Sequence, residues 1–283
     1  MESFSQQSEL QEALKAARRE GKTIAFVPTM GNLHEGHLSL MRQAKQHADI
    51  CVASIFVNPL QFGPNEDFDA YPRTLQQDQE KLQSERVDFL YLPTIDDIYP
   101  RGMDKHTQVK AIDQLTNKLC GASRPNHFLG VTTIVNILFN IVQPDIAIFG
   151  KKDFQQLQVI KRMVDDLCMP IEIIGGKIVR EKNGLAMSSR NGYLSDLEKD
   201  QASHLRATII ATQKQIEAGD RDYSSLIRDA QKHLKQDGFK VDYFEIVNRA
   251  TLEPAKEQDR ELLIAAAAWL GQPRLIDNQE VDI

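Results

Sequence analysis

Short apolar runs alternate with amphipathic segments over the first 180 residues of this 283-residue chain. Strands are predicted at 23–28, 50–57, 87–92, 145–149 and 171–179. Helical periodicity marks 8–19, 38–47, 75–84, 131–142 and 154–167, and Pro, Gly or Asn bounds the last four of these segments. Strands that alternate with helices build a parallel sheet with crossover helices. The pattern therefore predicts an α/β fold with a Rossmann-like, doubly wound parallel sheet.

The pattern changes after about residue 188, where helices and strands no longer alternate. Two helices are predicted at 196–218 and 224–236, followed by strands at 241–247, 262–267 and 274–276. Helices followed by strands indicate an α+β unit. We therefore expect two domains, a Rossmann-like domain at 1–180 and a smaller C-terminal α+β domain at 181–283.

Composition and charge narrow the classes of function. The net charge of −6 argues against a nucleic-acid binder that uses a broad basic face. No stretch approaches the ~20 apolar residues of a membrane span, so no membrane role is expected. The three cysteines are widely separated, which indicates neither a disulfide framework nor a zinc site. These features favour a reduced, cytoplasmic chain.

The turn at 29–37 follows the first predicted strand and holds two glycines and two histidines. Strand-to-helix turns of α/β folds expose backbone N–H groups to anions, and the positive end of the next helix adds to the attraction. Gly31 and Gly36 would let the backbone approach a ligand closely. His34 and His37 would add side-chain donors, so the turn is a candidate phosphate site.

This turn also admits other interpretations. Glu35 between the histidines suggests a zinc protease, but that motif needs histidines four apart and here they are three apart. A polar loop with structurally satisfied histidines is the plainer alternative. The glycine spacing matches neither the Walker loop nor the dinucleotide fingerprint. A phosphate site of another kind therefore remains as an interpretation of this turn.

Amides follow the second predicted strand, where Asn58 and Gln61 can each donate and accept hydrogen bonds. Such groups suit a hydroxyl or a carboxylate, although an Asn-Pro turn followed by a solvated Gln is the simpler explanation. In a parallel sheet the loops that begin at Pro28, Asn58 and Gly150 should converge in one crevice. Their position therefore favours a binding role.

Two further segments carry charge. Lys152, Asp153 and Gln156 follow Gly150 and could share one face near the start of a helix, where Lys would meet an anionic ligand. A solvent-exposed basic turn is the alternative. Segment 184–191 offers two hydroxyls and a guanidinium, which together suit a phosphate but occur in many loops.

Taken together, the segments closely resemble the pantoate–β-alanine ligase (pantothenate synthetase) family, which belongs to the HIGH-motif nucleotidyltransferase group. The resemblance covers essentially the whole chain, in order and in spacing. The matching segments are 28–37, 56–62, 71–74, 121–125, 142–145, 150–156, 187–191, 267–271 and 274–278. One departure is Leu129, where many members of the family have Arg.

The resemblance implies an ATP-dependent ligase that joins (R)-pantoate to β-alanine through a pantoyl adenylate and releases AMP and pyrophosphate. His37, His34 and Lys152 would be catalytic. Gln61 and Gln156 would bind pantoate, and Gln61 would also contact β-alanine. The implied ATP site comprises Met30, Gly31, Asn32, Leu33, His34, Glu35, Gly36, His37, Gly150, Lys151, Lys152, Asp153, Val179, Met187, Ser188, Ser189 and Arg190.

The resemblance also implies Mg²⁺ as the cofactor that accompanies ATP, with Asp78 as its ligand. It implies a homodimer and a C-terminal domain that acts as a lid, and the polar loop at 63–71 is a further lid candidate. The alternatives are an adenylyltransferase that acts on a phosphate ester and a nucleotide sensor without turnover. The amides Asn58, Gln61 and Gln156 favour a small hydroxy acid over a phosphate ester.

Overall fold

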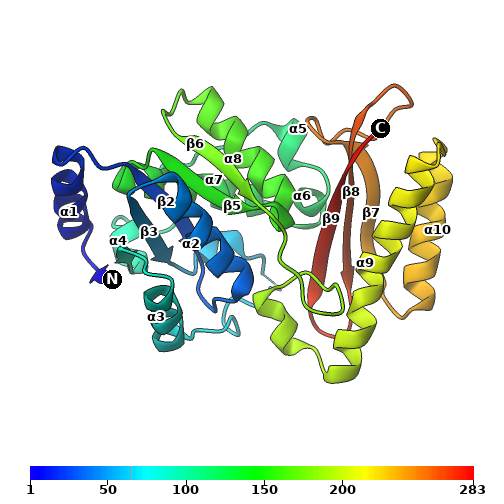
Figure 1. Cartoon of the computed structure of the whole chain (residues 1–283), viewed down its shortest axis with the longest axis horizontal. Helices are drawn as coiled ribbons and strands as arrows, with labels where there is room; N and C mark the ends of the chain where they lie inside the picture. The colour runs from blue at the N-terminus through cyan, green and yellow to red at the C-terminus, as the bar shows by residue number, and fades with distance from the viewer. Residues whose placement is uncertain (65) are drawn as a thin grey trace. The chain divides into compact units, whose positions relative to one another are not determined.

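The computed structural model describes residues 1–64 and 66–283 (Figure 1). The chain divides into two compact units, each built from more than one stretch. Unit 1 comprises Met1–Ile112, Arg124–Lys151 and Gln156–Lys177. Unit 2 comprises Asp113–Ser123, Lys152–Gln155 and Ile178–Ile283. The expected domain boundary after residue 180 stays a prediction.

Unit 1 contains a six-stranded sheet in which every pairing is parallel. The strand order is β1-β4-β3-β2-β5-β6. The strands are β1 (Glu2–Phe4), β2 (Ile24–Thr29), β3 (Ile50–Ile55), β4 (Phe89–Tyr91), β5 (Ile146–Gly150) and β6 (Glu172–Gly176). The predicted α/β fold is confirmed. The short strand β1 was not predicted, because three residues that include Glu2 and Ser3 show no apolar run.

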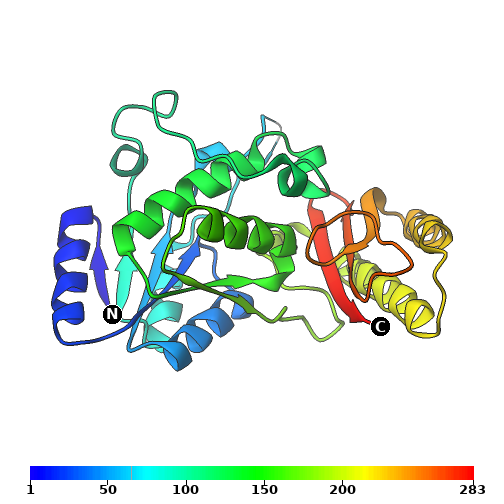
Figure 2. The same ribbon diagram turned by 90° about the horizontal axis from the view of Figure 1, so that it is seen from above.

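Helices cover the sheet of unit 1. They are α1 (Gln7–Arg19), α2 (Glu35–His47), α3 (Leu75–Ser84), α4 (Ile95–Ile98), α7 (His127–Val142) and α8 (Phe154–Asp166). Helix α1 packs beside α7, and α2 packs beside α3. Figure 2 shows α7 and α2 on opposite faces of the sheet, which is the doubly wound arrangement. Each long helix agrees with a predicted segment to within a few residues.

The register of the sheet brings three strand ends to one edge. Thr29 at the end of β2 pairs with Ile55 at the end of β3. On the other side of β2, Phe26 pairs with Ala147, so the ends of β2 and β5 are also level. The chain proceeds from β2 to β3 on one side, whereas β5 lies on the other. This is the switch point at which doubly wound sheets bind ligands.

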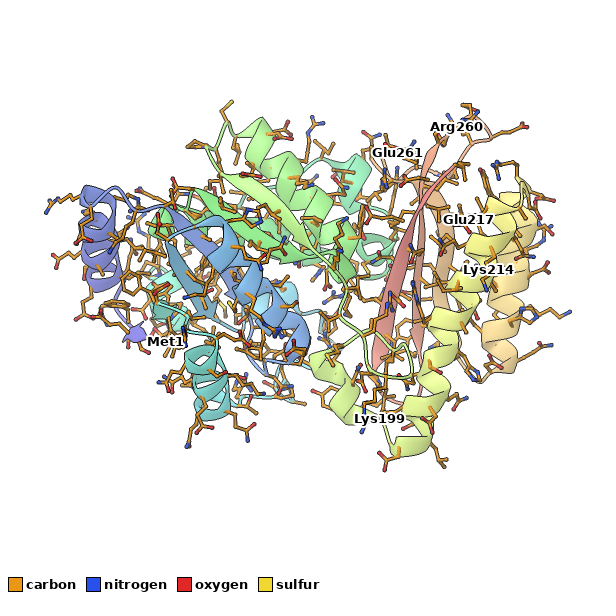
Figure 3. The ribbon with its side chains drawn as sticks, viewed as in Figure 1. Met1, Lys199, Lys214, Glu217, Arg260 and Glu261 are labelled. Atoms are coloured by element: carbon orange, nitrogen blue, oxygen red, sulfur yellow. The ribbon has the colours of Figure 1, made fainter. Side chains whose placement is uncertain are left out.

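Unit 2 contains a three-stranded antiparallel sheet in the order β7-β8-β9. Its strands are β7 (Lys240–Asn248), β8 (Glu261–Trp269) and β9 (Arg274–Asp282), and its helices are α5 (Asp113–Thr116), α6 (Cys120–Ser123), α9 (Asp196–Glu217) and α10 (Tyr223–Gln236). Helices α9 and α10 pack against the sheet over a core that includes Leu205, Ile209, Phe244 and Leu262. Figure 3 labels Lys199, Lys214 and Glu217 on α9. Among the described residues, no helix has both the length and the apolar character for crossing a bilayer.

Glycine at position 130 allows α7 to touch the turn that follows β3. A Cβ at Gly130 would lie 2.2 Å from the carbonyl oxygen of Leu60. Real Cβ atoms do not approach backbone this closely, so any larger residue must displace the turn. The carbonyl of Gly130 also accepts a hydrogen bond from Nδ2 of Asn58 at 3.2 Å. Gly130 therefore positions the turn that carries Gln61.

We expect Gly130→Ala to lower the free energy of unfolding by about 1–3 kcal/mol, because overpacking forces the backbone at Leu60 to move. Urea unfolding monitored by circular dichroism measures the change. Gly192→Ala is the matched control, since a Cβ at Gly192 meets nothing within 4 Å. Equal unfolding midpoints for the two variants would contradict the close contact.

Candidate active site

The turn after β2 has a defined backbone shape. Gly31 has a φ of +82°, and Asn32 follows with a φ of +48°. A side chain on Gly31 would be strained at this φ, and its Cβ would lie 3.1 Å from Ile55 Cγ2. Thr29 Oγ1 accepts from the Gly31 N–H at 3.2 Å and donates to the Ser54 carbonyl at 2.8 Å. These bonds connect the turn to the end of β3.

A buried carboxylate holds the middle of this turn. Asp78 on α3 is 1% exposed. Its Oδ2 accepts from the Asn32 N–H at 2.8 Å, and its Oδ1 accepts from the Leu33 N–H at 2.7 Å. Thr74 Oγ1 donates to the same Oδ2 at 3.2 Å. Asp78 thus fixes the backbone of the turn, which the sequence did not reveal. A role of Asp78 in binding Mg²⁺ stays a prediction.

The two histidines lie at the start of α2, with His34 directly before the helix and His37 in its first turn, and both accept hydrogen bonds at Nδ1. His34 Nδ1 accepts from the Gly36 N–H at 3.1 Å, and His37 Nδ1 accepts from the His34 N–H at 3.2 Å. Their ring centroids lie 4.1 Å apart, and both side chains are half-buried. In a neutral imidazole whose Nδ1 accepts, the proton is on Nε2. The turn therefore carries two Nε2–H donors side by side at the end of β2.

The remaining residues of this predicted segment have different surroundings. Leu33 is buried, and its carbonyl accepts from Lys81 Nζ at 2.6 Å. Met30 is half-buried, whereas Glu35 is exposed and forms an ion pair with Arg42.

Residues 1–64 and 66–283 contain no group of three His, Cys, Asp or Glu side chains that could hold a metal ion.

Asn58 supports the second turn, which precedes Gln61. This residue is completely buried, and its Oδ1 accepts from the Tyr99 hydroxyl at 2.8 Å. Burial raises the pKa of Tyr99 to about 12, so the hydroxyl remains a donor at neutral pH. The short helix η1 (Pro59–Gln61) follows Asn58 and ends at half-buried Gln61. Asn58 thus shapes the turn that presents Gln61.

Arg124 and His127 hold the backbone of Gln61, and neither was predicted as a site residue. The Gln61 carbonyl accepts from Arg124 Nη2 at 3.2 Å and from His127 Nδ1 at 2.8 Å. Arg124 also forms two hydrogen bonds of 2.6 Å with the carboxylate of Glu66. Burial alone would raise the pKa of Glu66, but the hydrogen bonds and charge of Arg124 outweigh it and lower the pKa. The position of Gln61 is therefore coupled to a charged pair.

The predicted lid loop at 63–71 falls partly on Asn65, which lies outside the described residues. Around it, aromatic rings are in contact. Phe62 packs edge-on against Phe68 at 5.4 Å and against Tyr71 at 5.8 Å between ring centroids. The guanidinium of Arg73 lies over Phe68 at 5.5 Å. A lid role for this loop stays a prediction.

The segment after β5 begins with a 3₁₀ turn, η2 (Lys151–Asp153), and α8 starts only at Phe154. Lys152 and Asp153 therefore precede the α-helix on which they were expected to share a face with Gln156. Lys151, Lys152 and Gln156 are half-buried, and Asp153 is exposed. The buried glutamine is Gln155, which bonds to backbone groups of α5 and α6 and their connection.

Unit 2 brings together further residues that were predicted for the ATP site. The Met187 N–H donates to the Val179 carbonyl at 3.0 Å, within a short antiparallel pairing of Arg180 with Ala186. Ser188 then caps η3 (Ser189–Tyr193) by accepting from the Arg190 N–H at 3.2 Å. Val179 and the serine loop are thus neighbours, although nearly ten residues separate them in the sequence.

The predicted site residues are shared between the two units. Unit 1 carries the 29–37 turn, Gln61, Asp78, Gly150, Lys151 and Gln156, and unit 2 carries Lys152, Asp153, Val179 and Met187 to Arg190. Leu129, the residue at which the chain departs from many members of the family, is half-buried on α7.

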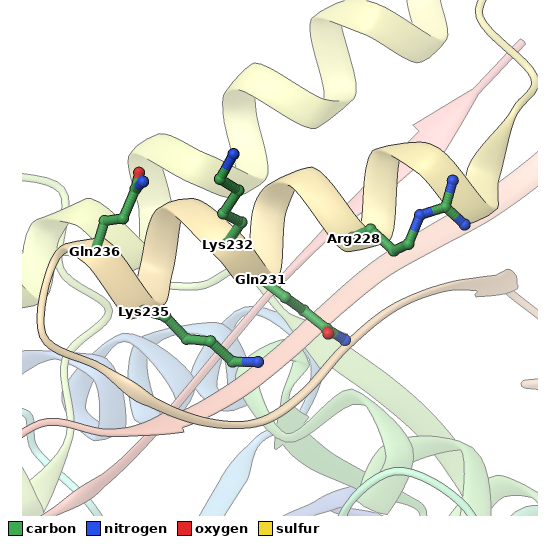
Figure 4. Close-up of a pocket in the computed structure, with 5 residues that line it drawn as sticks. All are labelled: Arg228, Gln231, Lys232, Lys235 and Gln236. Atoms are coloured by element: carbon green, nitrogen blue, oxygen red, sulfur yellow. The ribbon is translucent and has the colours of Figure 1, made fainter.

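A separate surface pocket of about 450 Å³ lies along α10 (Figure 4). It is lined by Arg228, Gln231, Lys232, Lys235 and Gln236, none of which was predicted as a site residue.

Comparison with known proteins gives matches over the full length. The family model described as pantoate-β-alanine ligase matches residues 2–280. A pantothenate synthetase from Saccharophagus degradans is 51% identical and covers 100% of this chain and 99% of its own length. A pantothenate synthetase from Shewanella loihica is 56% identical over 92% of each chain.

Solved structures agree with these matches. The pantothenate synthetase of Thermus thermophilus aligns over 100% of both chains with a TM-score of 0.93 and 42% identity. The pantoate-β-alanine ligase of Francisella tularensis, described as a complex with β-γ ATP and β-alanine, aligns over 99% of this chain and 97% of its own, with a TM-score of 0.82 and 33% identity. The chain therefore belongs to the pantoate-β-alanine ligase family.

Proposed function

We propose that this chain is the ATP-dependent ligase that condenses (R)-pantoate with β-alanine to give pantothenate. In the first step, a pantoate carboxylate oxygen attacks the α-phosphorus of ATP and pyrophosphate leaves. In the second step, the amine of β-alanine attacks the acyl carbon of the pantoyl adenylate and AMP leaves. The family match over residues 2–280 and the Francisella complex with β-γ ATP and β-alanine support this reaction.

The single observation that carries the proposal is the pair of imidazoles at the end of β2. Both accept backbone N–H groups at Nδ1, which directs the Nε2–H donors away from the turn. They lie at the N-terminus of α2, where the helix dipole also favours negative charge. We assign His34 and His37 to the triphosphate, with His37 as the donor to charge that develops at the α-phosphate.

Other predicted residues receive complementary roles in this proposal. Lys152 neutralises oxygens of the α- and γ-phosphates, and Ser188, Ser189 and Arg190 bind the β- and γ-phosphates. Gln61 and Gln156 bind the hydroxyls and carboxylate of pantoate, and Gln61 also contacts β-alanine. Asp153 and Val179 orient the nucleoside. No covalent nucleophile is required, because transfer of this kind depends on positioning and charge stabilisation.

Mg²⁺ belongs to the proposal as a companion of the triphosphate. Its charge would offset the phosphate charge when ATP binds. Asp78 is the candidate ligand, but both of its oxygens already accept backbone N–H groups. We therefore expect substrate phosphates to supply most of the Mg²⁺ ligands. The homodimer, the cytoplasmic location and a lid role for the C-terminal domain also stay predictions.

A pyrophosphate-release assay tests the proposed function. The protein is incubated with ATP and Mg²⁺, then pantoate and finally β-alanine are added. We expect release that depends on pantoate, and pantothenate only after β-alanine is present. Release that ignores pantoate would favour the adenylyltransferase alternative, and no release at all would favour the nucleotide sensor.

We expect His37→Ala and Lys152→Ala each to slow pantoate-dependent pyrophosphate release by roughly 10²-fold, because each removes one donor to developing phosphate charge. His47→Ala is the matched control, since His47 is exposed at the end of the same helix as His37. Gln156→Ala should instead raise the KM for pantoate more than that for ATP. A rate for His37→Ala or Lys152→Ala within about threefold of the unmodified protein would refute the assigned role.

A further inference from the structure

A largely buried ion pair in unit 2 joins two residues that were not predicted as site residues. Both carboxylate oxygens of Asp277 on β9 accept from Arg180, at 2.7 Å and 2.9 Å. Asp277 is only 4% exposed, and the Arg180 side chain is 20% exposed. A bidentate pair of this kind fixes both direction and distance. Arg180 and Asp277 therefore act as a rigid connection between two segments far apart in the sequence.

Arg180 is part of the segment that leads into the serine loop. It pairs with Ala186 across a short antiparallel bridge, and its Nη1 also donates to the Gly184 carbonyl at 3.1 Å. Asn191 closes the same segment by donating to the Ala186 carbonyl at 3.1 Å. The conformation of the chain on either side of Met187 thus depends on where Arg180 is held.

Asp277 is connected to the segment that carries Lys152 through its neighbour Asn278. The Asn278 N–H donates to Asp277 Oδ1 at 2.8 Å, and Asn278 Nδ2 donates to the Lys152 carbonyl at 2.9 Å. Asn278 is 5% exposed, so water competes little for this bond. The backbone that carries Lys152 is thereby attached to β9.

The Asp277 carboxylate also compensates the charge of a second guanidinium, that of Arg206. Arg206 on α9 donates to Gln279 Oε1 at 2.8 Å and to the Asn278 carbonyl at 3.4 Å. Burial lowers the pKa of Arg206, the charge of Arg180 lowers it further, and Asp277 opposes both. Without the carboxylate, two half-buried cations would face each other uncompensated.

We propose that Arg180, Asp277 and Asn278 are positioning residues for the nucleotide. Together they hold the Lys152 segment and the segment that leads to Ser188, Ser189 and Arg190 in one fixed arrangement within unit 2. The phosphate-binding groups proposed above then need no reordering when ATP binds. This inference rests on the proposed function, because it assigns no separate activity to these residues.

Two conservative variants and one matched control test this proposal. Arg180→Lys keeps the charge but removes the planar fork, and Asn278→Asp keeps the shape but removes the donor to the Lys152 carbonyl. Arg249→Lys is the matched control. Arg249 is 18% exposed in the same unit and pairs with Asp282 at 2.9 Å and with Glu261, labelled in Figure 3.

We measure the KM for ATP and for pantoate in pyrophosphate release, together with the affinity for a non-hydrolysable ATP analogue by calorimetry. Arg180→Lys and Asn278→Asp should each raise the KM for ATP and the Kd of the analogue by about tenfold, because misplaced groups bind the phosphates less well. The KM for pantoate should stay within about twofold in both variants, and every constant of Arg249→Lys should stay within about twofold.

Folded variants that bind the analogue as tightly as the unmodified protein would overturn the inference. Equal losses for ATP and pantoate would also overturn it, since they would indicate a general structural role. The proposed function is judged separately. If the unmodified protein binds the analogue but releases no pyrophosphate with pantoate, the ligase assignment fails, and the calorimetric comparison of the variants still decides the positioning role.

Discussion

The hydrogen bonds from the 29–37 turn to Asp78 are the interaction on which the candidate site depends. One buried carboxylate accepts two consecutive backbone N–H groups, and each bond to a charged acceptor contributes about 1.5–3 kcal/mol. The turn delivers His34 to the first position before α2, where its ring and that of His37 cap the helix. The tautomer of both histidines, and hence their ability to donate to phosphate, follows from this local shape.

In each unit, a buried aspartate carboxylate accepts hydrogen bonds that position a segment of the candidate site. In unit 1, Asp78 fixes the backbone before His34. In unit 2, Asp277 fixes Arg180 and the neighbouring Asn278, which holds the Lys152 carbonyl. Each carboxylate is almost completely buried and is surrounded by donors, so neither is left as an uncompensated charge. The histidines, Lys152 and the two glutamines proposed to bind substrate are half-buried, whereas Asp78 and Asp277 are almost completely buried.

Much of this fold could be predicted from the sequence, because apolar periodicity reports burial. The parallel sheet and its long helices follow from that pattern, and the family from motif order. Strand β9 was predicted only as 274–276, since its second half is polar, yet it pairs with β8 as far as Asp282. The contacts of Asp78, Arg124 and Arg180 were not predictable, because each joins residues more than forty positions apart.

The most direct test of the central claim is the unfolding free energy of Asp78→Asn without nucleotide or Mg²⁺. The amide cannot accept at both atoms, so one backbone N–H of the turn loses its partner. We predict a loss of about 1–3 kcal/mol, accompanied by weaker binding of an ATP analogue in the absence of Mg²⁺. An unchanged unfolding free energy, with only the Mg²⁺ dependence of ATP binding lost, would contradict the claim that Asp78 holds the turn.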